Sequence, residues 1–459
     1  MSGNHPDTGC TEKGRGSTTG GPAPTLAIPG VLHIPELALL GGLPVRSGEL
    51  PTYPPVGAEE VAALKRVLDS GDAEAWTSGP AGTVHRELED AFADYCGAKH
   101  AVAVNSGGMA LCIALRAAGL SPGDEVLFQV DTCHAESVEV IHAGGVPVWA
   151  DARLETGGLC ETSARETLAR QERVRFLVPI HTWGRPENLD FVLALTQQHK
   201  LTVIEDCCLA LGAEWRGRKV GTHGVAGVFS FGLSKPLRAG EGGMIVTNDD
   251  GFARECALLR ARGLLPELTG DDDVHALGWN GRLSAFAAAV ALAQLRRYPE
   301  LLAQLQANAR LLETAVHGCD GLALFAEHER QSAHGCTEFG FRVLPERLGI
   351  PRPLFCEALR AENVSCDEGS FAPTCRYDFF RSGEWKRWVL RRDGLAAVEA
   401  NYARGYPGAD RLFDEEAVYL PRATFLHEAD ARATATAIEK VCANAQQLVA
   451  LAPRSARPD

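Results

Sequence analysis

The stretch of sequence that decides the fold is residues 201–248, LTVIEDCCLALGAEWRGRKVGTHGVAGVFSFGLSKPLRAGEGGMIVTN. It opens with an apolar run that ends in Glu205 and Asp206, so a carboxylate is expected where a buried strand ends. Ser230 and Lys235 follow in and after a second strand-like run, ahead of a cluster of glycines. Ligands of α/β proteins bind beyond the carboxyl ends of the strands, so these side chains indicate a ligand site.

The residue types of this stretch favour a pyridoxal phosphate site. That cofactor needs a lysine for a Schiff base, a carboxylate that keeps its pyridine nitrogen protonated, and hydroxyl and backbone N–H donors for its phosphate. Taken singly the residues are weak evidence, because a lysine after a strand is usually solvated and an aspartate that closes a strand is usually a cap or turn residue. The prediction of a pyridoxal phosphate site rests on the combination of these residues.

Short β-branched runs alternate with helical patterns on both sides of this stretch. The runs are residues 101–104, 125–128, 146–149, 175–180, 201–206, 227–231 and 242–248. This alternation predicts an α/β fold with a largely parallel central sheet covered on both faces. Apolar residues at helical spacing predict amphipathic helices in residues 57–71 and 84–95, and a long helical stretch in 286–316.

Composition along the chain predicts three parts. Residues 1–36 are rich in Gly, Ser, Thr and Pro and are expected to form a flexible tail. Residues 37–310 are expected to form a large cofactor-binding domain, and residues 311–459 a smaller α+β domain.

Charge and cysteine content exclude several classes of protein. The 459 residues include 45 Lys+Arg and 59 Asp+Glu, a formal charge of −14, so no basic field would attract nucleic acid or an anionic membrane. No run approaches the roughly 18 apolar residues of a membrane span, and no signal peptide is evident, so a soluble, cytoplasmic protein is expected. The 14 cysteines are then expected to be reduced, and none has zinc-site spacing, so no metal is predicted.

Seven motifs in order resemble the DegT/DnrJ/EryC1/StrS family of fold-type I aminotransferases, which act on sugars and cyclitols. They are VNSGGMAL (104–111), GDEVLF (123–128), GGVPVWAD (144–151), HTWGRPENLD (181–190), IEDCCLALGA (204–213), FSFGLSKPLRAGEGG (229–243) and GWNGRLSAFAAAVALAQL (278–295). The resemblance spans roughly residues 37–450. It implies the fold-type I architecture, a large domain with a mostly parallel sheet plus a smaller C-terminal domain.

The resemblance also implies roles for individual residues. Lys235 matches the lysine that binds pyridoxal phosphate and shuttles protons, and Asp206 matches the carboxylate that pairs with the pyridinium nitrogen. Ser230 matches the phosphate-binding hydroxyl. The turn Ser106, Gly107 and Gly108 matches the turn whose N–H groups reach the phosphate, and small residues before a helix support that reading independently.

Two further matches imply an assembly. Asn280 and Arg282, in GWNGRLSA, match positions that in this family approach the cofactor phosphate from the partner subunit. A homodimer with shared active sites is therefore expected.

Three positions depart from the family pattern. Gly108 stands where the family usually has a threonine hydroxyl, and Cys133 where an aromatic residue usually stacks on the cofactor ring; the neighbouring His134 is a candidate replacement. Leu209 stands where the family usually has Gln or His near the phenolic oxygen, and an apolar side chain cannot make that hydrogen bond.

The expected function is transfer of an amino group from glutamine or glutamate to a keto-cyclitol or keto-sugar in secondary, antibiotic metabolism. The leader LALLGGLPVR (37–46) resembles the keto-cyclitol branch and the related aminohydroxybenzoate synthases. Arg376 and Tyr377 lie where the family has a loop that contacts the substrate. Two alternatives stay open, which are another pyridoxal phosphate reaction on the same scaffold and a non-catalytic paralogue that binds the cofactor.

Overall fold

The structure, a computed structural model, describes residues 36–71, 76, 83–369, 371–391 and 393–451. The larger of its sheets has seven strands in the order β1-β9-β8-β5-β4-β2-β3. The strands are β1 (His100–Val104), β2 (Glu125–Gln129), β3 (Val146–Ala150), β4 (Val174–Leu177), β5 (Thr202–Asp206), β8 (Ala226–Ser230) and β9 (Gly243–Thr247). Only β9 runs antiparallel to its neighbours within this sheet. The predicted largely parallel sheet is confirmed.

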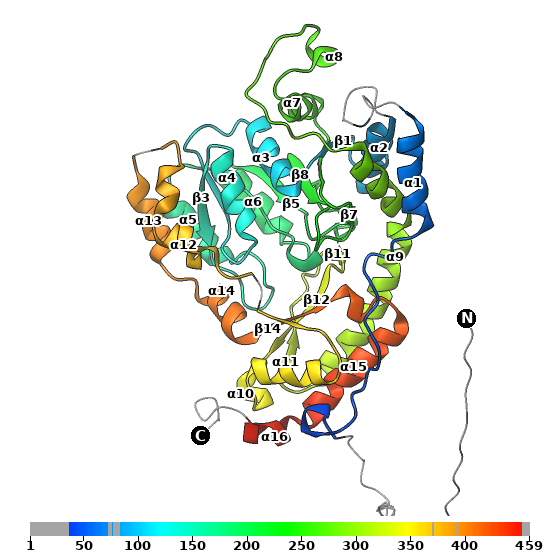
Figure 1. Cartoon of the computed structure of the whole chain (residues 1–459). Coiled ribbons are helices and arrows are strands. Elements are labelled where there is room, and N and C mark those ends of the chain that lie inside the picture. Colours follow the sequence, from blue (N-terminus) through cyan, green and yellow to red (C-terminus); the bar gives the residue numbers. More distant parts are fainter. Residues whose placement is uncertain (1–35, 72–75, 77–82, 370, 392, 452–459) are drawn as a thin grey trace, which may run out of the picture. The chain divides into compact units, whose positions relative to one another are not determined.

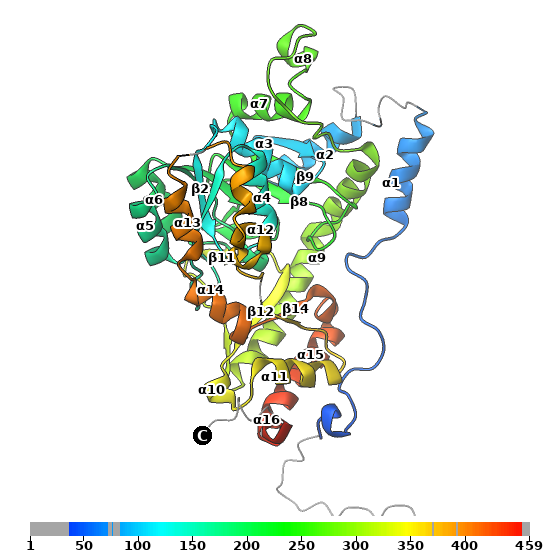
Figure 2. The same ribbon diagram turned by 60° about the vertical axis from the view of Figure 1, so that its left-hand side comes forward.

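Helices cover both faces of this sheet. Figure 2 shows α3 (Gly107–Ala117) and α4 (His134–His142) on one side, and α5 (Glu161–Arg170) and α6 (Leu189–His199) on the other. The strands are buried on both faces, which explains their uninterrupted apolar sequences. The predicted strand at 175–180 is shorter in the structure, where β4 ends at Leu177 ahead of Pro179, whose nitrogen has no hydrogen to donate.

The second layer is a four-stranded antiparallel sheet in the order β10-β12-β14-β13. Its strands are β10 (Leu322–Leu324), β12 (Glu338–Val343), β14 (Ala417–Pro421) and β13 (Asp367–Glu368). Helices α11 (Arg352–Ala361) and α15 (Glu428–Ala443) pack beside it.

A single long helix, α9 (Ala285–His317), joins the two sheets. It starts beside α1 (Ala58–Asp69) and α2 (Thr83–Cys96) and continues to the four-stranded sheet (Figure 1). All three helices were predicted from apolar spacing. The predicted domain boundary at residue 310 falls inside α9, and the division into two domains stays a prediction.

A small third sheet links distant parts of the chain. The hairpin β6 (Glu214–Trp215) and β7 (Arg218–Lys219) pairs with β11 (Gln331–Ala333), which comes from the segment after α9. The remaining α-helices are α7 (Asp250–Arg260), α8 (Pro266–Thr269), α10 (Pro345–Leu348), α12 (Asp378–Arg381), α13 (Leu395–Ala403), α14 (Pro407–Arg411) and α16 (Ala445–Leu448).

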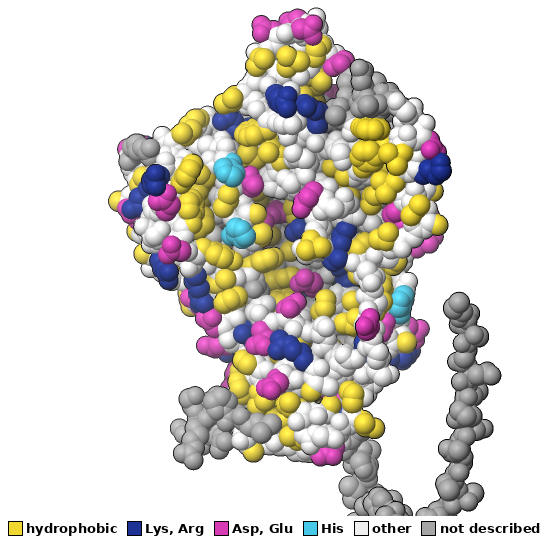
Figure 3. Space-filling model, in the orientation of Figure 1, with side chains coloured by type: hydrophobic (Ala, Val, Ile, Leu, Met, Phe, Trp, Pro, Cys, Tyr) yellow, Lys and Arg dark blue, Asp and Glu magenta, His cyan; other side chains and the backbone are white. Residues whose placement is uncertain are grey.

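The remaining expectations from the sequence concern the N-terminal tail, the surface charge and membrane-spanning helices. Residues 1–35 of the predicted tail lie outside the described residues. Positive and negative side chains are interspersed over the face seen in Figure 3. None of the helices in the described ranges is both long enough and apolar enough to cross a membrane.

Candidate active site

The sequence-predicted site residues gather at one edge of the seven-stranded sheet. Asp206 ends β5 and Ser230 ends β8, while Ser106 follows β1 and Cys133 follows β2. These four strands run in the same direction, so their carboxyl ends share one edge. Lys235 lies in the loop that leaves β8 at this edge.

The turn before α3 forms a cradle with Ser230. The hydroxyl of Ser106 caps the helix by accepting the N–H of Met109 at 3.0 Å. Gly107 and Gly108 are the first helical residues, and the first N–H groups of a helix have no acceptor within it. A Cβ at Gly107 would lie 2.5 Å from the Cβ of Ser230, so only glycine allows this approach. The cradle presents N–H groups, a hydroxyl and the positive end of a helix dipole, which together suit a phosphate.

Contacts from distant segments fix the backbone around Lys235. Arg422 donates a hydrogen bond to the carbonyl of Ser234 at 2.8 Å, and Tyr53 donates its hydroxyl hydrogen to the carbonyl of Pro236 at 2.8 Å. The Arg422 guanidinium also lies 4.2 Å from the centre of the Tyr53 ring. The residues on both sides of Lys235 are therefore anchored.

Two arginines near the site, Arg238 and Arg185, hold backbone carbonyls. Arg238 donates to the carbonyl of Tyr53 at 2.6 Å and to that of Lys235 at 3.4 Å. Arg185 donates to the carbonyls of Phe325 and Ala326, both at 2.9 Å. Both guanidinium groups therefore have structural partners.

The buried carboxylate of Asp206 faces a second acid that sequence reasoning missed. Asp206 is 4% exposed, and its Oδ1 accepts the N–H of Cys208 at 2.8 Å. The Glu136 carboxyl group lies near that of Asp206, and its Oε2 has no hydrogen-bond partner in the described part of the chain. Burial, followed by the charge of Asp206, raises the pKa of Glu136 well above its usual range. Glu136 therefore keeps its proton to a higher pH than an ordinary glutamate does.

This acidic surrounding acts on the lysine. Burial opposes the charged form of Lys235, but Cys208, Asp206 and Glu136 outweigh burial and raise the pKa of the Lys235 amine above its ordinary value. These groups therefore favour the ammonium form of Lys235.

A glutamate occupies the space beside Gly108. A Cβ at Gly108 would lie 2.7 Å from Oε1 of Glu139, so a larger residue there requires the Glu139 side chain to move. The other oxygen of Glu139 accepts a hydrogen bond from His142 at 3.1 Å. Glu139 therefore lies beside Gly108, one of the three positions that depart from the family pattern.

The position of the absent stacking residue is surrounded by different groups. His134 is exposed, and its ring centre lies 5.4 Å from that of Tyr377. Tyr377 is brought there because Thr374 binds the carbonyl of Val130 through its N–H at 2.8 Å and its hydroxyl at 2.9 Å. Burial, then Glu136, raises the pKa of Cys133 to about 11, so its thiol is neutral at physiological pH.

Arg376 is placed differently from its neighbour Tyr377. Its guanidinium binds Asp414 at 2.6 and 2.8 Å and also pairs with Asp410. These contacts direct Arg376 toward α14 and the residues after it, so of the two predicted substrate residues only Tyr377 contacts a candidate cofactor residue.

Leu209 remains apolar and buried at the site. Its carbonyl accepts a hydrogen bond from the hydroxyl of Thr337, which ties the site to the segment before β12.

The predicted partner-subunit residues lie beside Val104 and Asn105, which precede the turn of the cradle. Asn105 donates its backbone N–H to Gly281 at 2.8 Å and its side-chain amide to the carbonyl of Asn280 at 2.9 Å. Arg282 forms a backbone bridge with Val104. Their contribution to a second subunit's site stays a prediction.

One buried cluster has the donor types of a metal site. Possible ligand atoms of His181, Glu205 and Cys207 lie within 4.8 Å of one another. Glu205, however, already accepts the N–H groups of Gly221 at 2.8 Å and Gly224 at 2.7 Å, and lies 3.2 Å from Nε2 of His181. Although burial disfavours its charge, these donors lower the pKa of Glu205. The carboxylate acts as a structural acceptor.

Comparison with known proteins decides the family. The profile of the DegT/DnrJ/EryC1/StrS aminotransferase family matches residues 55–384. The chain belongs to this family. It is therefore an aminotransferase, and the fold and enzyme class predicted from the motifs are confirmed.

Curated relatives and a solved structure agree with this assignment. The chain is 33% identical over 387 residues to a putative L-glutamine:3-amino-2,3-dideoxy-scyllo-inosose aminotransferase of Streptoalloteichus tenebrarius, covering 84% of this chain and 92% of the relative. It is 36% identical over 345 residues to an L-glutamine:scyllo-inosose aminotransferase of Streptomyces griseus, covering 71% and 79%. An aminotransferase structure from Psychrobacter cryohalolentis superposes with a TM-score of 0.75 at 26% identity, covering 87% of this chain and 100% of the other.

Proposed function

We propose that this aminotransferase uses pyridoxal phosphate to move the amino group of glutamine or glutamate to a keto group on a cyclitol or sugar, in secondary, antibiotic metabolism. The observation that carries the proposal is the convergence of Lys235, Asp206 and the cradle of Gly107 and Ser230 at one sheet edge. The relatives are named L-glutamine:inosose aminotransferases, and these names support glutamine as the amino donor and a keto-cyclitol as the acceptor.

The chain's own residues fit this cofactor. The cradle offers phosphate donors within a space that admits no Cβ at Gly107, and Asp206 supplies a buried carboxylate for a protonated ring nitrogen. When bound, pyridoxal phosphate supplies a carbonyl that takes up the amino group and an electron sink that stabilises negative charge at the substrate carbon.

Each residue then has a defined task. Lys235 would hold the cofactor covalently in the resting enzyme and, once freed, would hold and move the proton in both half-reactions. Asp206 would stabilise the positive charge of the ring nitrogen, and Glu136 would act on that charge through its neighbour Asp206. His134 and Tyr377 would border the ring and the acceptor.

The amino acceptor is tested by isotope transfer. Glutamine labelled with ¹⁵N at its α-amino group is incubated with the enzyme, pyridoxal phosphate and either a keto-inositol or a nucleotide-linked keto-sugar. The expected result is ¹⁵N in the aminated ring, measured by mass spectrometry, with none formed by Lys235→Ala. Loss of α-¹⁵N from glutamine without an aminated ring would point to a different acceptor. No consumption of glutamine or glutamate would favour another reaction or a non-catalytic role.

The shared-site homodimer and the cytoplasmic location belong to the same proposal. The match of GWNGRLSA, which contains Asn280 and Arg282, to the family motif supports the shared-site dimer.

A further inference from the structure

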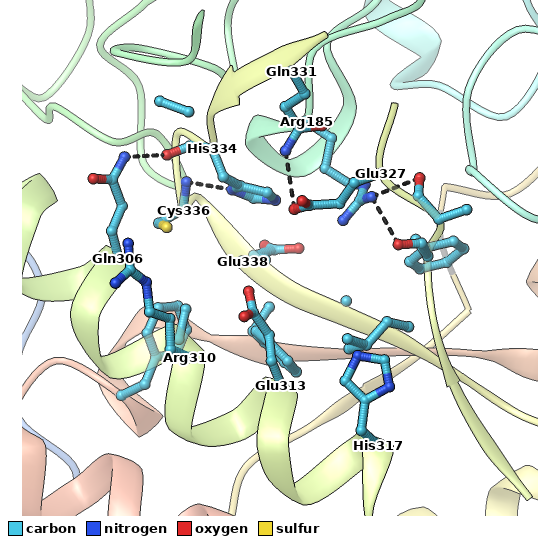
Figure 4. A pocket seen from close by; sticks show the side chains of 18 of the residues that line it. Arg185, Gln306, Arg310, Glu313, His317, Glu327, Gln331, His334, Cys336 and Glu338 are labelled. Carbon is cyan, nitrogen blue, oxygen red and sulfur yellow. Dashed lines mark hydrogen bonds between the residues drawn. The ribbon is translucent and has the colours of Figure 1, made fainter. Parts of the chain in front are cut away.

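The cavity beside the outer half of α9 has charged groups of both signs in its walls (Figure 4). It has a volume of about 640 Å³ and is lined by Arg185, Arg310 and His317 as well as by Glu313 and Glu327. A lining of mixed charge favours neither an anion nor a cation. The cradle in front of α3 is different, because its donors all suit an anion and a single carboxylate lies beside them.

The first turn of α3 offers two backbone N–H groups without an acceptor. Ser106 caps the helix through Met109, and the N–H groups of Gly107 and Gly108 donate to no group in the described part of the chain. The Ser230 hydroxyl adjoins them, since a Cβ at Gly107 would lie 3.0 Å from its Oγ. These donors are the ones that a cofactor phosphate would use.

The side chain of Glu139 lies against the same turn. Glu139 belongs to α4, which packs on α3. A Cβ at Gly108 would lie 3.1 Å from the Cγ of Glu139, 3.0 Å from its Cδ and 2.7 Å from its Oε1. The carboxylate end of this side chain is therefore next to the phosphate donors. The side chain is 22% exposed, so water screens its charge only in part.

Few positive groups balance this carboxylate. Its Oε2 accepts a hydrogen bond from Nδ1 of His142 at 3.1 Å, and no lysine or arginine nitrogen of the described residues lies within 4.0 Å of it. Arg116 of α3 instead donates to the carbonyl of Ala143 at 3.3 Å. Burial, then the charge of Glu139, raises the pKa of Cys112 on α3 to about 12, so this charge acts on α3.

A carboxylate and a phosphate at the start of α3 would oppose each other. Either anion alone is stabilised by the positive end of the helix dipole. A phosphate monoester, however, carries a charge of about −1.5 to −2 at pH 7, and two anions a few ångströms apart repel each other more strongly in a partly buried site than in water.

We propose that Glu139 is part of the phosphate subsite and competes, as an internal anion, with the cofactor's phosphate for the first turn of α3. Glu139 thereby lowers the affinity of the protein for pyridoxal phosphate and favours exchange of bound cofactor with free cofactor. This inference rests on the proposed pyridoxal phosphate site.

Removal of the charge tests the inference. Glu139→Gln keeps the shape of the side chain, and its dissociation constant for pyridoxal phosphate should be about tenfold lower than that of the wild type. The constants are measured by absorbance titration of the full chain after cofactor has been removed by dialysis. Glu357→Gln, which changes an exposed glutamate on α11, is the matched control and should bind like the wild type.

A second probe locates the effect at the phosphate. Pyridoxal has the same ring and aldehyde but no phosphate, so its dissociation constant should be the same for Glu139→Gln and the wild type. The advantage of Glu139→Gln with pyridoxal phosphate should also shrink as salt is added, because salt screens the repulsion that the substitution removes. A purely structural effect of the substitution would alter the binding of both probes and would not depend on salt. Thermal unfolding without cofactor checks that each variant is folded.

The outcomes separate this inference from the proposed function. Binding of pyridoxal phosphate that depends on Lys235 but is equal or weaker in Glu139→Gln would overturn the inference alone, and so would an equal gain with both probes. No Lys235-dependent binding of pyridoxal phosphate to the wild type would overturn the inference together with the proposed function.

Discussion

At the residue scale, the site combines residues that match family motifs with an acidic group, Glu136, that lies outside the quoted motifs. Motif order led to Lys235, Asp206, Ser230 and the glycine turn, because each of these residues belongs to a quoted motif. The role of Glu136 could not be predicted in the same way, because Glu136 belongs to none of these motifs. Its proximity to Asp206 joins α4 with the end of β5, two elements far apart in the sequence, and its place shortly after the end of β2 was the one indication in the sequence.

The buried proton of Glu136 predicts a signed pH dependence of stability. The folded protein keeps this proton above the ordinary glutamate value of 4.5, where the unfolded chain loses it. The folded state then binds more protons, so its stability falls with rising pH by up to about 1.4 kcal/mol per pH unit. Glu136→Gln removes this cost, and its melting temperature should gain on the wild type between about pH 5 and about pH 8.

The control for this measurement is Glu357→Gln, which changes an exposed glutamate. Melting temperatures of the wild type and Glu136→Gln that run parallel across the pH range would show that Glu136 ionises normally.

Ser230 gives a prediction about the phosphate. Ser230→Ala removes a hydroxyl from the cradle, and a hydrogen bond to a charged group contributes about 1.5–3 kcal/mol, so the dissociation constant of pyridoxal phosphate should rise at least about tenfold. Ser234→Ala is the matched control, because Ser234 is exposed and contributes its backbone carbonyl to Arg422. Equal affinities of the two variants, measured by fluorescence titration, would remove Ser230 from the phosphate site.

At the element scale, the position of the loop after β8 matters most for the chemistry, because this loop carries Lys235. The long strands and helices were predictable because each has a regular pattern of buried side chains over many residues. Strands of two or three residues, such as β6, β7, β11 and β13, have no such pattern, and only their partners determine them. The sequence also could not predict that Tyr53 and Arg422 anchor this loop, because both residues lie far from it along the chain.

Removal of the hydroxyl oxygen of Tyr53 tests its role in anchoring the loop after β8. Tyr53 is 6% exposed and donates to the carbonyl of Pro236, so Tyr53→Phe leaves a buried acceptor without its partner. The free energy of unfolding in urea should fall by about 1–3 kcal/mol at an unchanged slope. An unchanged midpoint would mean that water or another donor replaces the hydroxyl.

At the scale of the whole molecule, two sheets are joined by α9 and by the pairing of β11 with the β6–β7 hairpin. The alternating pattern predicted the first sheet and a smaller second part. The pairing between residues from opposite sides of α9 could not be predicted, because nothing in either short segment specifies its distant partner.

The shared-site dimer predicts subunit complementation. Lys235→Ala and Arg282→Ala should each be inactive as pure dimers if the Arg282 of one subunit serves the Lys235 of the other. Random mixing makes half of the dimers mixed, with one intact site each, so activity should recover to about a quarter of the wild-type value. No recovery after mixing, despite exchange of subunits, would place Arg282 in its own subunit's site.

The central claim is that Lys235 holds pyridoxal phosphate in a site that accepts an amino group. The most direct measurement is the absorbance spectrum of the protein with pyridoxal phosphate, before and after addition of glutamine or glutamate. A visible band that depends on Lys235, is absent in Lys235→Ala and is retained in Lys65→Ala, a surface lysine paired with Asp69, is predicted. The amino donor should convert it to the spectrum of the pyridoxamine form. No lysine-dependent band, or a band that no amino donor changes, would contradict the account.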